Sequence, residues 1–400
     1  MEKEAAVMQQ RKGISILGYG CMRFTRSGNS IDFDKAEKEF MRAYELGVNY
    51  FDTAYIYPGS EDVVGRIIEK NGIRDKINLA TKLPQYLIKS RAALDRYFDE
   101  ELKRLRTDHV DYYLMHHMTD LAQWEKLKAI GIEEWLSEKK ANGQIRHVGF
   151  SFHGDTKTYL SILNAYDWEL SLVQYNYLDE HTQAGRDGIH AAAQKGVKVL
   201  IMEPLRGGKL VDLLPEKAKR EIANEHHKRS PAEWAFRWLW DQEDITCVLS
   251  GMNSIEMIEE NCRIASEVTP GEFGPEEKEF IAKIKSYILE STKVNCTGCR
   301  YCMPCPRGVD IPAIFSCYNH MYSENKSSGR LEYFQTVALR MTPADASLCV
   351  QCGKCEQHCP QSIPIREKLK EADKKLRPPH QKIFLKVAKR FMLGKKKPKD

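Results

Sequence analysis

Long hydrophobic runs are missing from this sequence of 400 residues, in which no stretch approaches the roughly 18 consecutive apolar residues of a membrane-spanning helix. The opening stretch, MEKEAAVMQQRKG, is too polar for a secretory signal. The composition, 42% hydrophobic and 29% charged, is typical of a soluble globular enzyme. We therefore expect a cytoplasmic protein, and both membrane spanning and export are disfavoured.

Cysteine is scarce in the first 290 residues, which contain three of the twelve cysteines. This distribution argues against a disulfide scaffold, and in a reducing compartment dense groups of thiols are typical of metal sites. The three scattered residues, Cys21, Cys247 and Cys262, are expected to be small buried hydrophobes. The other nine cysteines lie between residues 296 and 359, and we expect most of them to bind metal.

Acidic residues are almost absent from residues 376–400, which hold nine Lys or Arg and one Asp. Since the whole chain carries +5 and this segment +8, the remainder carries −3, and its charge excludes nucleic acid as a partner. The stretch QKIFLKVAKRFMLGKKKPKD spaces apolar residues as a helical stripe among lysines. Such a basic amphipathic helix can bind an anionic membrane surface or an acidic partner; the alternative is an ordinary solvated end.

Eight short, β-rich apolar runs recur along the chain, at residues 14–22, 48–55, 77–83, 110–117, 145–152, 170–177, 197–205 and 245–252. The segments between them have helical periodicity, as where Leu94, Phe98 and Leu102 share one face. This alternation predicts an α/β fold, a (β/α)8 TIM barrel whose chemistry lies at the C-terminal strand ends. We predict a barrel over residues 1–290, a small domain over 291–375 and a basic tail over 376–400.

The ends of three successive runs carry polar side chains of defined types. The second run ends in FDTAYIYPGSE, and the third and fourth end in Lys82 and His116. Here the chain resembles the aldo-keto reductase family, whose strands present an Asp and a Tyr five residues apart, then a Lys and a His. Over roughly residues 13–265 the resemblance implies a catalytic set of Asp52, Tyr57, Lys82 and His116, because the five-residue step selects Tyr57 over Tyr55.

These residue types suit the reduction of an aldehyde or ketone to an alcohol. A nearby ammonium lowers the pKa of a tyrosine by favouring the phenolate, so we expect Lys82, held charged by Asp52, to activate Tyr57 as the proton donor. His116 is expected to align the substrate carbonyl. The alternative is a buried Asp and Lys pair beside an ordinary core Tyr and His.

The resemblance also implies a nicotinamide cofactor, NADH or NADPH, with candidate contacts at Ser151, Gln174, Leu205, Glu260 and Asn261. Ser151 and Gln174 match the carboxamide contacts, and Glu260 and Asn261 match the adenine side. Leu205 opens PLRGGKL, in which Arg206, Lys209 and flexible glycines are candidates to cradle a pyrophosphate, although a glycine-rich loop alone is weak evidence.

Some positions depart from the family pattern. Met202 stands where many members place an aromatic ring over the nicotinamide. Gly251 and Met257 stand where NADPH-dependent members carry cations for the 2′-phosphate. These departures favour an alternative of a different class, a non-catalytic redox-sensing or electron-relay protein built on the same barrel.

Two cysteine sets lie 53 residues apart and form an internal repeat. The second, CVQCGKCEQHCP, is the C-x2-C-x2-C-x3-C-P run of bacterial two-cluster ferredoxins, and the first, CTGCRYCMPCP, resembles it. The resemblance implies a small α+β ferredoxin-like domain with two [4Fe-4S] clusters. In such ferredoxins the fourth cysteine of each run binds the opposite cluster.

The resemblance therefore assigns Cys296, Cys299, Cys302 and Cys359 to one cluster, and Cys349, Cys352, Cys355 and Cys305 to the other. One gap departs from the pattern, because two residues instead of three separate Cys302 from Cys305. Cys317 is a conceivable substitute for Cys305. Zinc is the rival metal, but its four-cysteine sites usually come from two separated pairs.

The two halves use different electron chemistry. A nicotinamide moves two electrons as hydride, whereas a [4Fe-4S] cluster moves one, and the sequence shows no flavin-binding signature. An external flavoprotein, another redox partner or the substrate would have to connect them; alternatively, the clusters are structural.

Cofactor preference is directly testable. Because a phosphate binds poorly without cations, and residues 251 and 257 are Gly and Met, we expect NADH to bind no more than about tenfold more weakly than NADPH, or roughly 1.4 kcal/mol. Titration of the protein with each nucleotide measures this ratio. A preference for NADPH of about a hundredfold would mean that Arg206, Lys209 or another cation reads the 2′-phosphate.

Overall fold

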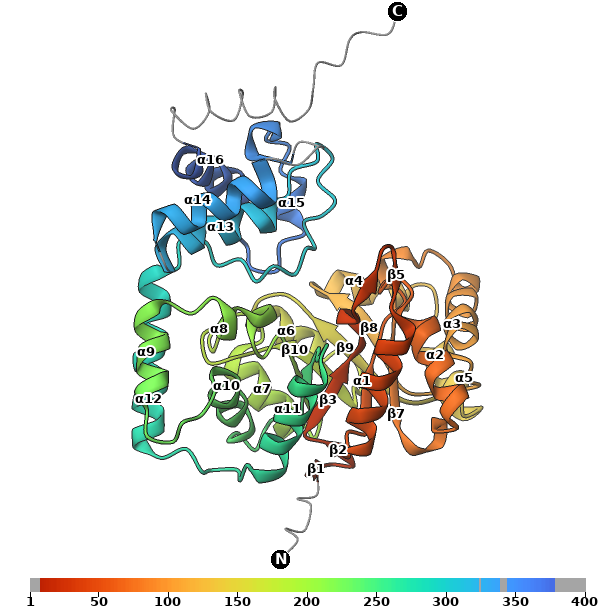
Figure 1. Cartoon of the computed structure of the whole chain (residues 1–400). Helices are drawn as coiled ribbons and strands as arrows, with labels where there is room; N and C mark the ends of the chain where they lie inside the picture. Colours follow the sequence, from red (N-terminus) through yellow and green to blue (C-terminus); the bar gives the residue numbers. More distant parts are fainter. Residues whose placement is uncertain (1–7, 324, 339–343, 378–400) are drawn as a thin grey trace, which may run out of the picture. The chain divides into compact units, whose positions relative to one another are not determined.

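The structure, a computed structural model, describes residues 8–323, 325–338 and 344–377 (Figure 1). Most of the predicted basic tail, from residue 378 on, lies outside these ranges. Among the helices in these ranges, none combines the length and apolar character needed to cross a membrane.

Eight parallel strands close into a barrel, as the sequence predicts. They are β3 (Leu17–Gly20), β6 (Tyr50–Asp52), β7 (Asn78–Leu83), β8 (Val110–Met118), β9 (Ile145–Phe152), β10 (Leu170–Gln174), β11 (Lys198–Met202) and β12 (Cys247–Ser250). The ring closes where β12 pairs with β3, with Leu249 opposite Gly18. Each strand falls inside one predicted apolar run except β8, which extends one residue further.

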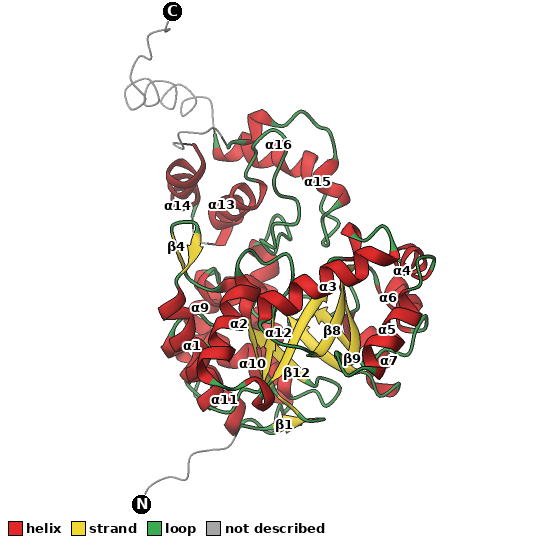
Figure 2. Ribbon diagram, turned by 90° about the vertical axis from the view of Figure 1, so that its right-hand side faces the viewer, coloured by secondary structure: helices red, strands yellow, loops and turns green. Residues whose placement is uncertain are grey.

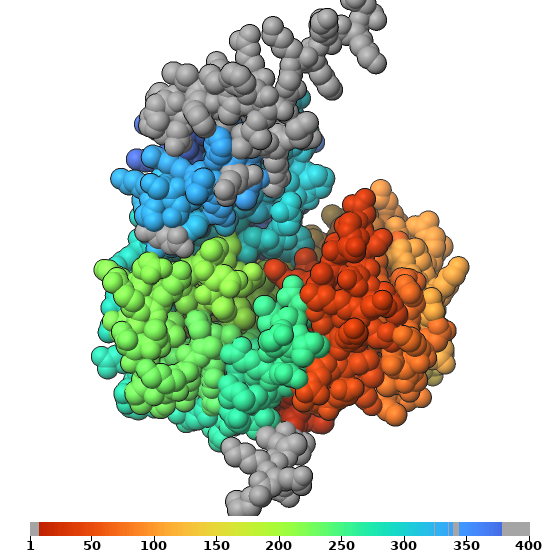
Figure 3. Space-filling view, in the orientation of Figure 1, coloured from red at the N-terminus to blue at the C-terminus, as the bar shows by residue number. Residues whose placement is uncertain are grey.

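Helices surround the strands, which Figure 2 shows in yellow inside the red helices. They are α1 (Phe33–Glu45), α2 (Ser60–Asn71), α3 (Arg91–Leu105), α4 (Leu121–Lys128), α5 (Ile132–Ala141), α6 (Thr156–Leu163), α7 (Gly185–Gln194), α10 (Pro231–Trp240) and α11 (Ile255–Glu267). Helix α1 begins where Asp32 accepts a hydrogen bond from the backbone N–H of Lys35. Arg42 of α1 donates to Glu259 of α11, and these helices lie side by side at the surface (Figure 3).

The barrel interior is filled by side chains rather than left open. Tyr50, Tyr112, Leu172 and Leu249, from the alternate strands β6, β8, β10 and β12, belong to one buried cluster, as expected for a barrel of eight strands. A short antiparallel pair, β1 (Gln10–Arg11) with β2 (Ile14–Ser15), precedes the first barrel strand. Another, β4 (Arg26–Ser27) with β5 (Ser30–Ile31), follows it. The barrel is thus a packed core, and ligands must bind at its ends.

The chain divides into two compact units. The first comprises residues up to Pro204 together with Ala232–Glu277, and the second comprises Leu205–Pro231 together with the residues from Lys278 on. The segment that follows β11 therefore packs with the C-terminal part of the chain. This division falls at residue 277 and includes an internal segment. It describes packing within the folded chain, so the predicted domain boundary near residue 290 stays a prediction.

The second unit is helical. Its helices are α8 (Lys209–Asp212), α9 (Glu216–Asn224), most of α12 (Pro275–Ser291), α13 (Ile311–Ser323), α14 (Lys326–Tyr333), α15 (Lys354–Gln357) and α16 (Ile365–Leu376), with a π-helical turn at Phe334–Ala338. Short 3-10 turns occur at Cys21–Arg23, Arg74–Lys76, Gln85–Leu87, Arg206–Gly208 and Ala346–Leu348 across both units.

The C-terminal domain differs from the expected α+β composition in one respect. Its described residues after α12 contain helices and loops but no strand. The two cysteine runs are loops interrupted by glycine and proline, which do not favour strands, and the sequence between them folds as α13 and α14. Ile314, Phe315, Tyr318 and Leu369 belong to the buried core of this domain.

Gly65 marks a close approach of α2 to α3. A Cβ atom there would lie 2.6 Å from the backbone carbon of Leu105 and nearer still to the carbonyl oxygen of Arg104. An alanine in a helix normally stabilises by about 1 kcal/mol relative to glycine, but here we expect Gly65→Ala to cost about 1–3 kcal/mol because two backbones must move apart. Thermal unfolding followed by circular dichroism measures the effect.

Gly271→Ala is the control, because Gly271 has a φ of +76° but no atom within 4 Å of the added Cβ. We expect only the backbone strain there, about 1 kcal/mol. An unfolding midpoint for Gly65→Ala at or above that of the unmodified protein would show that the two helices can separate freely.

Candidate functional site

The four residues expected to be catalytic come from neighbouring strands of the barrel. Asp52 ends β6, Lys82 lies one residue before the end of β7, and His116 lies in β8. Tyr57 follows β6 in a turn in which its backbone N–H donates to Ala54 O at 3.0 Å. Parallel strands bring these four side chains to the same end of the barrel, the end at which barrel enzymes place their chemistry.

Lys82 and Asp52 form a buried ion pair. Lys82 Nζ donates to Asp52 Oδ1 at 2.5 Å and to the backbone oxygen of Thr53 at 2.7 Å. Lys82 is 0% exposed and Asp52 is 4% exposed. Burial raises the pKa of Asp52, and the Lys82 charge opposes that rise. Two charges removed from water in this way hold each other in place, since separating them leaves an uncompensated charge.

Tyr57 lies beside this pair. Lys82 Nζ is 5.1 Å from the centre of the Tyr57 ring. Burial raises the pKa of Tyr57 above its ordinary value, and the charge of Asp52 adds to the rise. The expected lowering of this pKa is therefore not found in the free protein, because burial disfavours the phenolate and outweighs any effect of the nearby ammonium. Tyr57 accordingly keeps its proton at neutral pH.

His116 completes the group. Its ring lies edge-on to the Tyr57 ring, with the two centres 5.9 Å apart. Burial lowers the pKa of His116 well below its ordinary value, and the Lys82 charge adds to the lowering. His116 is therefore neutral at physiological pH. A neutral imidazole carries one N–H donor, which suits the alignment of an uncharged carbonyl oxygen.

Tyr55 points to other partners. Its hydroxyl donates to Glu100 Oε2 at 3.0 Å, and its ring lies 4.2 Å from the guanidinium carbon of Arg104. Neither partner belongs to the predicted catalytic set. This placement favours Tyr57 over Tyr55 as the proton donor.

Cys21 is a neighbour of the site that sequence reasoning treats as a simple core residue. It is 1% exposed, its carbonyl oxygen accepts a hydrogen bond from Ser60 Oγ, and burial followed by the charge of Asp52 raises the pKa of its thiol well above the ordinary value. Its location could not be predicted, because it depends on the pairing of β3 with β6.

The residues expected to contact the nicotinamide carboxamide lie on β9 and β10, which are adjacent. Ser151 Oγ accepts a hydrogen bond from the backbone N–H of His117 at 2.8 Å. Gln174 Nε2 donates to Asp179 Oδ2 at 2.7 Å, and its oxygen accepts from Gln183 Nε2 at 2.6 Å. Gln174 is fully buried, so this network, which the sequence does not reveal, orients its amide.

The residues expected on the adenine side lie on α11, which follows β12. Asn261 is buried and donates to Ser250 Oγ at 3.3 Å, whereas Glu260 is partly exposed. Gly251 has an unexpected neighbour. A Cβ there would lie only 3.0 Å from Cδ of Arg23. The absence of a side chain at Gly251 therefore leaves room for the exposed Arg23. Arg23 places a cation next to the position where NADPH-dependent members of the family carry one.

Leu205, Arg206 and Lys209 belong to the second unit. Arg206 donates to Asn295 Oδ1, and Lys209 Nζ donates to the backbone oxygen of Cys296 at 2.6 Å. The two cations proposed for a pyrophosphate cradle thus contact the start of the first cysteine run, a contact that sequence spacing could not predict.

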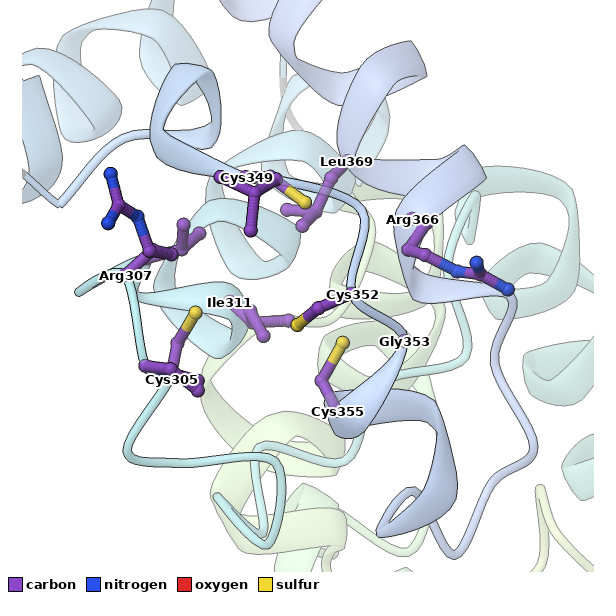
Figure 4. Close-up of a pocket in the computed structure, with 12 residues that line it drawn as sticks. Cys305, Arg307, Ile311, Cys349, Cys352, Gly353, Cys355, Arg366 and Leu369 are labelled. Atoms are coloured by element: carbon purple, nitrogen blue, oxygen red, sulfur yellow. The ribbon is translucent and has the colours of Figure 1, made fainter.

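Four cysteines from two separate segments surround one pocket (Figure 4). They are Cys305, from the first run, and Cys349, Cys352 and Cys355, from the second. Among the described residues that line this pocket, none carries a carboxylate. Four thiols and an otherwise apolar or cationic lining fit a [4Fe-4S] cluster.

The other four cysteines are also neighbours. Burial raises the pKa of Cys302 to about 12, and the nearby thiols of Cys296, Cys299 and Cys359 add to the rise. Such an effect places the sulfur atoms of these three cysteines near that of Cys302, and Cys296 likewise influences Cys359. Each set of four thus combines three cysteines of one run with the last cysteine of the other.

The two cysteine runs repeat their backbone conformation as well as their sequence. In the first run Gly298 and Arg300 have φ values of 77° and 68°, and 53 residues later Gln351 and Gly353 have values of 61° and 75°. Left-handed backbone is uncommon for arginine and glutamine. Its recurrence at matching positions indicates that both loops curl in the same way around a group of the same shape.

Cys317 has a different environment from the eight cysteines assigned to clusters. It is a buried residue of α13, and its sulfur lies 3.7 Å from Thr336 Oγ1. Burial raises the pKa of its thiol to about 12, and the charge of Glu332 adds to the rise. It does not line the pocket that holds Cys305.

Comparison with family models gives two matches. The model of the aldo/keto reductase family matches residues 16–273. The model of a 4Fe-4S dicluster domain matches residues 295–363.

Individual relatives share the first of these regions. An L-glyceraldehyde 3-phosphate reductase of Escherichia coli O157:H7 is 25% identical, over 62% of this chain and 82% of its own length. An L-galactose dehydrogenase of Arabidopsis thaliana is 26% identical, over 64% of this chain and 85% of its own. The holo form of an aldo-keto reductase from Bacillus halodurans is 27% identical and superposes with a TM-score of 0.57, covering 70% of this chain and 96% of that one.

The grouping of the thiols makes a testable prediction. Cys305→Ser should perturb the cluster bound by Cys349, Cys352 and Cys355, although Cys305 lies next to the first run in sequence, because its side chain lines the other pocket. Iron and sulfide analysis after anaerobic purification, with paramagnetic resonance of the reduced protein, measures the effect.

Cys317→Ser is the matched control and should leave both clusters intact. Loss of iron in Cys317→Ser but not in Cys305→Ser would overturn the grouping. In the unmodified protein we expect about eight irons, the content of two [4Fe-4S] clusters.

Proposed function

We propose that this chain, which belongs to the aldo/keto reductase family, reduces a small aldehyde or ketone to an alcohol with a nicotinamide cofactor and exchanges single electrons through its dicluster domain. The observation that carries the catalytic part is the buried Lys82 and Asp52 pair beside Tyr57 and His116. The family and the relatives support an oxidoreductase.

Tyr57 is the proposed proton donor. When bound, the nicotinamide supplies a hydride to the carbonyl carbon. Tyr57 then gives its phenolic proton to the carbonyl oxygen, which becomes the alcohol hydroxyl. The raised pKa of Tyr57 keeps the phenol protonated until the oxygen becomes strongly basic. Lys82 stabilises the phenolate that remains, and Asp52 holds Lys82 in position.

His116 is the proposed orienting group. A neutral histidine donates one hydrogen bond to the carbonyl oxygen without competing with Tyr57 for transfer of the proton. A positively charged histidine would instead be a rival acid. The low pKa, produced by burial and by Lys82, therefore separates the two roles.

The proposed nicotinamide contacts are Ser151 and Gln174 at the carboxamide and Glu260 and Asn261 at the adenine side, with Leu205 near the pyrophosphate. Among these residues Gln174 has the side chain with the most fixed orientation, because Asp179 and Gln183 form hydrogen bonds with its amide. Arg23, beside Gly251, is the first residue to replace with alanine if NADPH proves strongly preferred over NADH.

Two [4Fe-4S] clusters are proposed for the C-terminal domain, one on Cys296, Cys299, Cys302 and Cys359 and the other on Cys305, Cys349, Cys352 and Cys355. Four cysteines around one pocket support the second set. We propose residues 1–290 as the catalytic barrel, 291–375 as the cluster domain and 376–400 as a basic tail.

Tyr57→Phe tests the proposed catalysis. It removes only the donated proton, so we expect kcat for a simple aldehyde such as glyceraldehyde to fall by about 10² to 10⁴ while affinity for the nicotinamide hardly changes. Steady-state rates and a nucleotide titration measure the two quantities separately.

Tyr55→Phe is the matched control, since Tyr55 bonds to Glu100 instead, and it should retain most of the activity. If Tyr55→Phe is the more damaging change, Tyr57 is not the acid. If neither changes the rate, the barrel does not reduce carbonyls through this site.

A further inference from the structure

The pocket formed by Cys305 and the second cysteine run opens to solvent. Cys352 is exposed, and the neighbouring Val350 is 57% exposed. Arg307 and Pro306, also exposed, line the same pocket. In the other group Cys302 is only partly exposed. A cluster bound by the set that includes Cys352 would therefore lie nearer to the protein surface, and electrons would travel a shorter distance between it and a partner molecule.

Two exposed cations, Arg307 and Arg366, line this pocket, and we define them, together with the exposed Lys354, as the cationic rim. Figure 4 shows Arg307 and Arg366 on opposite sides of the four cysteines. Lys354 is exposed and stands between Gly353, which lines the pocket, and Cys355. Val350, which also lines the pocket, adds an exposed apolar side chain to this surface.

The rim keeps most of its positive charge. Arg366 is paired with Glu356, whose Oε2 accepts from Arg366 Nε at 2.8 Å. Arg307 and Lys354 form no ion pair with any residue that the structure describes. A surface that combines an exposed apolar residue with two cations that have no ion pair is suited to a partner with an acidic rim and a small apolar contact.

We propose that this surface is the docking site of an acidic one-electron carrier protein. The inference rests on the proposed cluster at Cys305, Cys349, Cys352 and Cys355. One electron passes between this cluster and the redox group of the carrier, so that one loses what the other gains, and no bond is made or broken. The cationic rim attracts and orients the carrier, and Val350 supplies the contact.

A rival role for the cations is local, namely to offset the negative charge of the cysteine thiolates. Arg366 fits that role, since Glu356 fixes it. Arg307 and Lys354 are the residues that separate the two roles. Cations that serve docking affect the rate of encounter with a charged partner, and salt screens this effect; cations that only offset the thiolates affect every partner equally.

The experiment uses the full-length protein, reduced anaerobically, and follows cluster oxidation by stopped-flow absorbance. Flavodoxin is the acidic acceptor and cytochrome c is the basic one. At low ionic strength, Arg307→Glu with Lys354→Glu should slow electron transfer to flavodoxin at least about tenfold and should speed transfer to cytochrome c. Both differences should shrink as salt is added.

The matched control replaces two exposed lysines of the second unit that do not line the pocket, as Lys278→Glu with Lys326→Glu. It makes the same change in total charge and should alter both rates by less than about threefold. Equal effects of the two double variants would overturn the proposed site. So would a rim variant that keeps its full iron content but whose rates with both acceptors fall together, because docking cations should affect acidic and basic partners in opposite directions.

Iron content and paramagnetic resonance of each variant distinguish failure of the docking proposal from failure of the cluster assignment. If the rim variant does not load its cluster, the unmodified protein supplies the test. Its rate with flavodoxin should fall with rising salt, and its rate with cytochrome c should not. A flavodoxin rate that is independent of salt would overturn the proposal, even with both clusters present.

Discussion

The buried pair of Lys82 and Asp52 is the interaction on which the catalytic end of the barrel depends. Neither charge can return to water without opening the barrel, and removal of one partner from such a pair typically costs about 3–5 kcal/mol. The pair spans β6 and β7, so it fixes their register and also the base of the turn that carries Tyr57. It sets the charge environment in which Tyr57 stays protonated and His116 stays neutral.

A second constraint governs the C-terminal domain. Two loops of matching sequence adopt matching left-handed backbone at Gly298, Arg300, Gln351 and Gly353, and their cysteines combine crosswise into two groups. Small domains that lack sheets seldom hold such loops by apolar packing alone. Metal binding supplies folding energy in these cases, because the ligands converge only in the folded state. The core around Phe315 and Leu369 positions the loops, and the clusters would hold them closed.

The sequence predicts the barrel well because its strands are short apolar runs in regular alternation, and this pattern is local. The same holds for Asp52, Tyr57, Lys82 and His116, whose spacing relative to strand ends is visible in the chain, and for the cysteine repeat. Properties that depend on distant packing could not be predicted. The raised pKa of Tyr57 follows from its burial in the folded protein. Arg23 and Gly251 are close together although one lies near the start of the barrel sequence and the other near its end. The hydrogen bond from Lys209 to Cys296 likewise connects residues far apart in sequence.

The assignment of Leu205–Pro231 to the second unit has a consequence for how the chain can be divided. The polypeptide leaves the barrel unit after β11, returns at α10 and leaves again within α12, so three crossings connect the units. A single cut near residue 290 would separate Arg206 and Lys209 of this internal segment from Asn295 and the backbone oxygen of Cys296, to which they donate. A chain divided there would therefore lose hydrogen bonds made by an internal segment as well as the C-terminal residues themselves.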